Sequence, residues 1–134
     1  VEKGYFKEPK GPFAEYLGRN GKAYVERAKM TPAEGVEILT NVGGVAVLAH
    51  PASLSELDYK VAELKEAGLQ GIEVHYATYS TATIRYLSEV AKKHDLIPCG
   101  GSDYHCLGNS GEALPGTQGP PMETVVALMQ ASGS

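Results

Sequence analysis

Short apolar segments alternate with helix-forming segments along most of this 134-residue chain, and this alternation restricts the fold more than any other feature. Apolar runs at 45–49, 71–76 and 96–99 are predicted strands, each separated from the next by a segment of helical periodicity. Such an order predicts an α/β fold with parallel strands and right-handed crossovers. Three strands cannot close a barrel, for which about 250 residues are typical. We therefore expect the rest of the sheet upstream of Val1.

Capping motifs set the boundaries of the predicted helices. Thr31 and Glu34 form a capping box with Pro32 at the first helical position, and Ser53 and Glu56 form a second such pair. The helices are expected to begin at these caps, at Ser80 or Thr81 and near Met122, and to end at Gly43-Gly44, at Gly68, at Lys92-Lys93-His94 and near Ala131.

Apolar periodicity predicts which side chains these helices bury. The run at 45–49 is continuously apolar, as expected of a strand buried on both faces. Residues 1–29 are predicted to hold only short helical stretches, near 12–17. The expected buried faces of the first three capped helices are Val36, Leu39 and Val42, then Leu57, Val61, Leu64 and Ala67, and then Ile84, Leu87, Val90 and Ala91.

Composition indicates a globular protein, with 43% hydrophobic and 21% charged residues. No apolar run in the sequence is long enough for a membrane span, and we expect no secretory leader. The net charge of -4 argues against a large basic nucleic-acid surface, although bound metal ions could still attract a phosphorylated substrate. Cys99 and Cys106 form no CxxC pair, so we expect reduced thiols and a cytoplasmic location. Because the first residue is Val1, we expect a piece of a longer protein.

Side chains that bind metals follow all three predicted strands. His50 follows the first strand, Glu73 and His75 end the second, and Asp103 and His105 follow the third. In parallel sheets these strand ends meet at one edge, where chemistry collects. Residues two apart in an extended segment point the same way, so Asp103 and His105 could reach one site. A carboxylate and two imidazoles suit Zn, Mn or Fe, which makes His50, Asp103 and His105 predicted metal ligands.

Each of these signals is weak in isolation. A lone Asp-x-His more often caps a turn, and a lone His after a strand is as often structural; their coincidence at one edge favours a metal site. Glu73 and His75 alternate with apolar residues and could orient the ligands or bind substrate, or could equally be a polar pair inside the sheet. His94 follows two lysines at a helix end and is expected to be solvated.

The segments 43–51, 71–74 and 101–105 together resemble the polymerase and histidinol phosphatase (PHP) superfamily, and its bacterial nucleotide phosphoesterases and 5′-to-3′ exoribonucleases in particular. The stretch at 13–25 resembles the helical insertion of that branch. The resemblance implies a distorted seven-stranded β/α barrel with two or three divalent metals at its C-terminal rim. Residues 1–30 would end the insertion, and residues 31–134 would be the C-terminal half of the barrel domain.

The resemblance also assigns the ligands. His50 matches a late His ligand of the family, and Asp103 and His105 match its closing Asp-x-His. The opening His-x-His with its Asp, a middle His and a Glu ligand are absent and are expected upstream of Val1. Position 75 is often aromatic in this branch, which argues against a metal role for His75.

The implied activity of the intact protein is metal-dependent hydrolysis of nucleotide or oligoribonucleotide phosphate esters, with His50, Asp103 and His105 as catalytic residues. The expected partners are a phosphorylated small molecule or RNA end and the N-terminal half of the same domain, and the isolated chain is expected to be inactive and to self-associate. A catalytically silent PHP binding module and a histidinol-phosphate-type phosphatase are alternatives. A two-His-one-carboxylate iron oxygenase is a third, against which the α/β pattern argues.

Overall fold

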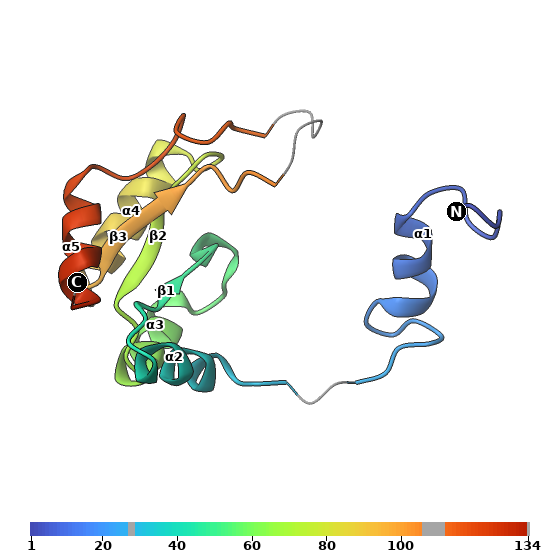
Figure 1. Cartoon of the computed structure of the whole chain (residues 1–134), viewed down its shortest axis with the longest axis horizontal. Helices are drawn as coiled ribbons and strands as arrows, with labels where there is room; N and C mark the ends of the chain where they lie inside the picture. Colours follow the sequence, from blue (N-terminus) through green and yellow to red (C-terminus); the bar gives the residue numbers. More distant parts are fainter. Residues whose placement is uncertain (27–28, 106–111, 134) are drawn as a thin grey trace. The chain divides into compact units, whose positions relative to one another are not determined.

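The computed structural model describes residues 1–26, 29–105 and 112–133, and the chain forms two compact units, Val1–Met30 and Thr31–Ser134 (Figure 1). In the first unit, α1 (Lys10–Pro12) runs directly into a π-helical turn, η1 (Phe13–Leu17). The Phe6 and Tyr16 rings meet edge to face, with centroids 5.7 Å apart. The predicted short helical stretch is confirmed.

The second unit contains a parallel three-stranded sheet in the order β1-β2-β3. The predicted α/β class and parallel order are therefore confirmed, whereas the seven-stranded barrel stays a prediction, because the described residues contain three strands. No helix in this part of the chain is both long and apolar enough to cross a bilayer. The elements are α2 (Pro32–Asn41), β1 (Val47–Leu48), the 3₁₀ turn η2 (Pro51–Ser53), α3 (Leu57–Glu66), β2 (Gly71–Tyr76), α4 (Thr81–Lys93), β3 (Ile97–Gly101) and α5 (Glu123–Ala131).

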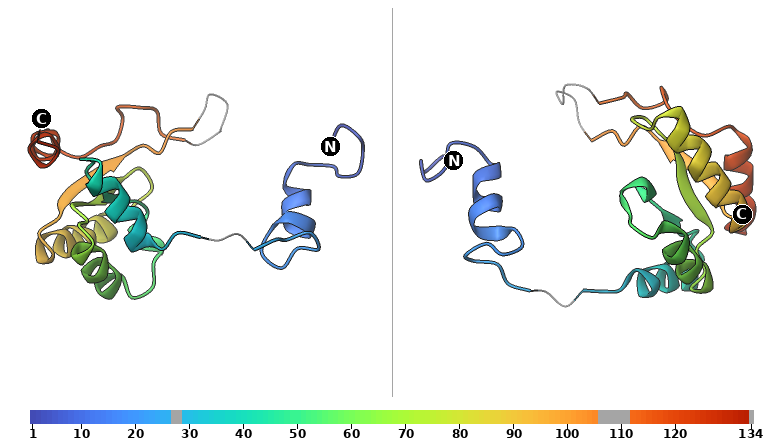
Figure 2. Two further views of the ribbon diagram at one scale, coloured as in Figure 1. Left: turned by 60° about the horizontal axis from the view of Figure 1, so that its bottom comes forward. Right: turned by 180° about the vertical axis from the view of Figure 1, so that it is seen from behind.

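The core lies between the sheet and the helices α3 and α4. Ile72 and Val74 of the central strand β2 are fully buried. Helix α4 packs on β2 and β3, and α5 packs on β3, as the ribbon shows (Figure 2). Each fully buried aliphatic side chain contributes about 1.5–3 kcal/mol relative to exposure. The helical residues of this core are Val36, Leu57, Val61, Leu64, Leu87, Val90 and Ala91.

The predicted caps are confirmed at two helices and wrong at a third. The Thr31 hydroxyl accepts the backbone N–H of Glu34 at 3.2 Å, and the Glu34 carboxylate accepts the backbone N–H of Thr31 at 2.7 Å. Ser80 caps α4 by accepting the N–H of Thr83 at 3.1 Å. The predicted Ser53 cap is wrong because Ser53 belongs to η2 and donates to the carbonyl of His50 at 2.8 Å. Helix α3 begins after Glu56 instead.

Two burial predictions are wrong for the described chain. In α2 only Val36 is buried, whereas Leu39 and Val42 are 49% and 77% exposed. In the apolar run at 45–49, only Ala46 is buried, and Val47 is 37% exposed. The reason is that β1 is an edge strand whose only partner in the described sheet is β2. An apolar pattern reports what a strand can bury, whereas neighbours determine what it does bury.

His94 is not the solvated residue that its neighbouring lysines predicted. Its side chain is 13% exposed, and its Nε2 lies 2.8 Å from Oδ1 of Asp58. Lys93 pairs with the other oxygen of the same carboxylate. The hydrogen bonds from Lys93 and His94 hold the pKa of Asp58 below its usual value. This cluster joins the end of α4 to the first turn of α3.

Of the two cysteines, the structure describes Cys99. Cys99 is a free thiol buried in β3, and burial raises its pKa. A thiol held protonated in this way is a poor nucleophile. Cys106 lies outside the described residues.

One extra residue in β2 breaks the regular pairing with β3. Glu73 pairs with Cys99, but His75 pairs with Gly100, so two steps along β2 correspond to one step along β3. Such a bulge bends a strand and re-aims its side chains. The backbones of the two strands approach so closely here that a Cβ at Gly100 would lie 2.2 Å from the carbonyl oxygen of His75. The bulge therefore requires glycine at position 100.

We predict that Gly100→Ala destabilises the chain by about 1–3 kcal/mol or more, because the new methyl group forces the two strands apart. Gly101→Ala is the matched control, since a Cβ there meets nothing within 4 Å. Urea unfolding of both variants measures the difference. Equal stability of the two would contradict the close approach at the bulge.

Candidate metal centre

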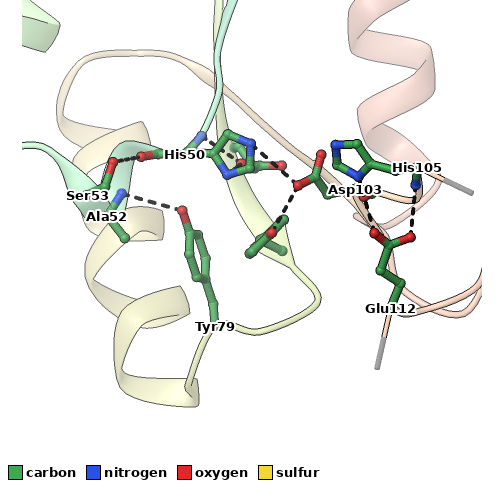
Figure 3. A network of polar contacts seen from close by, with 9 residues as sticks. His50, Ala52, Ser53, Tyr79, Asp103, His105 and Glu112 are labelled. Carbon is green, nitrogen blue, oxygen red and sulfur yellow. Dashed lines mark hydrogen bonds and ion pairs between the residues drawn. The ribbon is translucent and has the colours of Figure 1, made fainter. Parts of the chain in front are cut away.

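Residues from the ends of all three strands meet at the C-terminal edge of the sheet (Figure 3). His50 follows β1, Tyr76 ends β2 and Asp103 follows β3. The Nε2 atom of His50 lies 3.7 Å from Oδ2 of Asp103. The structure thus brings together two of the predicted metal ligands from positions 53 residues apart in the sequence (103 minus 50).

Glu73 holds His50 in place. The backbone N–H of His50 donates to Oε2 of Glu73 at 2.8 Å, and the Nδ1 atom of the His50 ring lies 3.8 Å from the same oxygen. The Glu73 side chain is only 14% exposed, whereas that of His50 is 48% exposed. A carboxylate behind one ring nitrogen leaves the other facing the open edge, which is how metal-binding histidines are commonly oriented.

Tyr76 connects the other two residues. Its hydroxyl donates to Oδ2 of Asp103 at 3.0 Å, and its ring meets the ring of His50 edge to face, with centroids 5.1 Å apart. The hydrogen bond to Asp103 raises the pKa of Tyr76, because ionisation would place two anions side by side. Tyr79 packs against Tyr76 with centroids 4.9 Å apart.

Sequence reasoning missed Tyr76 because it assumed strict alternation along β2. That assumption grouped His75 with Glu73, but the extra residue between them shifts the phase of the strand. Within the described chain, His75 makes no hydrogen bond or ion pair with the other residues of this edge, and its predicted role stays untested. The signal for the bulge was the Gly100-Gly101 pair at the facing end of β3, since glycine permits close backbone approach.

His105 is oriented by its own backbone. Its Nδ1 atom lies 2.7 Å from the carbonyl oxygen of Asp103, which can only accept, so Nδ1 donates a hydrogen to it and Nε2 is free of this contact. The backbone N–H of His105 donates to Glu112 at 3.1 Å, and its ring is 65% exposed. Figure 3 shows the ring beside Asp103 and Glu112. Nε2 is the nitrogen that could bind a metal.

The backbone at this edge is strained. His50 and Asp103 have φ of 50° and 53°, in the left-handed region that non-glycine residues seldom adopt. Such conformations cost about 1–3 kcal/mol each and persist where surrounding contacts enforce them. Here the contacts come from Glu73 to the backbone of His50 and from Tyr76 to the side chain of Asp103.

The donor atoms fit a divalent metal. Ligand atoms about 2.0–2.2 Å from one ion lie roughly 3–4 Å from each other, and the His50 and Asp103 atoms are 3.7 Å apart. The carboxylates of Glu73 and Glu112 add negative charge nearby. Within the described residues, however, no group of three or more His, Cys, Asp or Glu side chains is arranged to hold an ion. The described residues thus bring two metal-capable side chains, His50 and Asp103, within 3.7 Å of each other.

A cavity of about 320 Å³ adjoins this edge. Its lining includes Tyr76, Ser102, Asp103, His105 and Glu112. The volume is at the lower end of the range for small-molecule sites. Polar groups that face one small cavity beside metal donors suit a small polar ligand.

The chain is similar in sequence to proteins that are named as hydrolases of phosphoric esters. The chain is 28% identical over 125 residues to a 3′,5′-nucleoside bisphosphate phosphatase of Chromobacterium violaceum, which covers 90% of the chain and 44% of that protein. It is 32% identical over 97 residues to the 5′-3′ exoribonuclease Rnm of Escherichia coli, with 69% of the chain and 33% of that protein covered. No protein-family profile matches the chain.

The chain is also similar to a solved structure. A protein of Bifidobacterium adolescentis, assigned as a metal-dependent phosphoesterase, superposes with a TM-score of 0.72 at 25% identity. The alignment covers 98% of the chain and 47% of that structure. The chain is therefore similar to phosphoesterases in sequence and in fold, and it spans less than half the length of the curated relatives described above.

We predict that His50→Gly changes the free energy of unfolding by less than about 1 kcal/mol, because relief of the left-handed backbone offsets the lost ring contact with Tyr76. Glu56→Gly is the control, since Glu56 has φ of 53° and lies outside this edge. Urea unfolding should show neither variant strongly destabilised. A loss above about 2 kcal/mol in His50→Gly alone would mean that His50 serves packing.

Proposed function

We propose that the chain is the C-terminal half of a PHP-type, metal-dependent phosphoesterase domain, with residues 1–30 ending a helical insertion and residues 31–134 forming part of a β/α barrel. The observation that carries the proposal is the 3.7 Å approach of His50 to Asp103 at the C-terminal edge of a parallel sheet. Similarity to phosphoesterases over 90% of the chain supports it independently.

His50, Asp103 and His105 are the proposed ligands. His50 and His105 present Nε2, and Asp103 presents a carboxylate oxygen. Glu73 keeps the ring of His50 directed at the edge. Divalent ions bound there would neutralise phosphate oxygens, lower the pKa of a bound water and stabilise the leaving oxygen. Imidazole with carboxylate suits Mn, Zn or Fe.

The proposed substrates are phosphate esters of nucleotides or of oligoribonucleotide ends. The support is that the relatives are named for a nucleoside bisphosphate and for RNA. A chain of formal charge -4 would need the metal ions to attract such anions. We place this activity in the cytoplasm, in keeping with a buried free thiol at Cys99.

The remaining ligands are proposed to come from a segment outside these 134 residues. The chain spans 44% of the bisphosphate phosphatase and 47% of the solved phosphoesterase. A two- or three-metal clamp needs more donors than His50, Asp103 and His105 supply. The proposed partner of this chain is therefore the N-terminal half of the same domain.

In a protein that carries both halves, Asp103→Asn is predicted to lower phosphoesterase activity by orders of magnitude, because a neutral amide is a poor replacement for an anionic ligand. Asp95→Asn is the matched control, since Asp95 also has a positive φ, of 50°, and lies at the opposite end of β3. Asparagine tolerates this backbone at both positions. Rates with 3′,5′-nucleoside bisphosphate and with a short oligoribonucleotide measure the effect. Equal activity of the two folded variants would exclude Asp103 as a ligand.

The isolated chain is predicted to retain metal weakly, to hydrolyse nucleotide phosphates negligibly and to self-associate. The β1 edge favours association through unpaired backbone, and the exposed Leu39 of α2 and Val42 just after it favour association through apolar surface. Metal analysis, activity assays and sedimentation test these outcomes, and adding the N-terminal half should restore some activity. Robust Mn- or Zn-dependent turnover by the chain alone, lost in Asp103→Asn, would show that its site is complete.

A further inference from the structure

Tyr76 lies between the two proposed ligands and contacts both. Its hydroxyl is 3.0 Å from Oδ2 of Asp103, the same oxygen that faces Nε2 of His50 at 3.7 Å. Its ring packs edge to face on the imidazole of His50, at 79° between the ring planes. One side chain of the central strand thus restrains side chains that follow the two outer strands.

These contacts restrain residues whose backbones are strained. His50 and Asp103 both have left-handed φ, and a strained residue keeps one orientation only where several contacts enforce it. Glu73 accepts the backbone N–H of His50 and lies 3.8 Å from Nδ1 of its ring, whereas Tyr76 packs directly on that ring. A further aromatic ring supports Tyr76, because Tyr79 packs on it and places its own hydroxyl 3.5 Å from the backbone nitrogen of Ala52.

We propose that Tyr76 is a positioning residue that sets the relative orientation of the His50 imidazole and the Asp103 carboxylate, and thereby the affinity of this edge for a divalent ion. The inference rests on the proposed function. The hydroxyl occupies one lone pair of Oδ2 and leaves the remaining carboxylate lone pairs for the ion. The ring keeps Nε2 of His50 directed toward the same carboxylate. Partners of this kind typically change metal affinity by about 10–100-fold.

Tyr76→Phe isolates the hydroxyl, because the ring on His50 remains. In a protein that carries both halves, we expect Mn²⁺ affinity, measured calorimetrically on metal-free protein, to fall by about 10-fold. The kcat should recover at saturating Mn²⁺, and KM for the nucleotide should stay close to the wild-type value. In the metal-free protein, the ¹⁵N shifts of the His50 ring should move little, since the ring contact is retained.

Tyr76→Leu removes the ring as well. We expect a further loss of Mn²⁺ affinity and a clear change in the His50 ring shifts of the metal-free protein. Tyr86→Phe is the control, because Tyr86 is 51% exposed on α4 and outside this edge. It should bind Mn²⁺ as the wild type does. Thermal unfolding confirms that each variant is folded.

Three results would overturn the assignment. Wild-type Mn²⁺ affinity in Tyr76→Phe, together with lost affinity in Asp103→Asn, would reject the positioning role while leaving the proposed function intact. Unchanged affinity with a lower kcat at saturating Mn²⁺ would assign Tyr76 to the substrate instead. Unchanged affinity and activity in Asp103→Asn would refute the proposed function, and the role of Tyr76 would fall with it.

Discussion

The pairing of β2 with β3 is the constraint on which the rest of the second unit depends. β2 is the central strand, and its fully buried Ile72 and Val74 carry the packing of α3 and α4. The same strand pairs with β1 on one side and with β3 on the other. It therefore sets where the segments that follow β1 and β3 leave the sheet. Gly100 permits the close approach that this pairing requires. A displaced β2 would separate His50 from Asp103.

Burial of the hydrophobic core offsets the backbone strain of the candidate site. Left-handed backbone at His50 and Asp103 opposes folding, whereas burial beneath them favours it. Strain tolerated at exposed, chemically capable residues is typical of functional sites. The Asp58 cluster with Lys93 and His94 illustrates the opposite case, since there polar groups join two helices away from this edge.

Acidic side chains and exposed apolar side chains lie on different parts of the second unit. Negative carboxylates gather where the three strands end, and a divalent ion would relieve their mutual repulsion. Meanwhile Ile38 and Leu39 of α2 and the following Val42 are exposed, and β1 has a free edge in the described sheet. Apolar surface beside an unpaired strand fits the proposal that another part of the same domain completes the fold.

The sequence by itself determined the element order, the parallel sheet, most caps and the edge at which His50 and Asp103 meet, because these follow from local periodicity and from the geometry of parallel strands. Burial of Leu39 and the environment of His94 depended on neighbours distant in sequence, so periodicity could not determine them. Only the tertiary structure showed that Tyr76, rather than His75, contacts the candidate ligands. The physical reason is one extra residue in β2, which shifts the phase of every side chain after it.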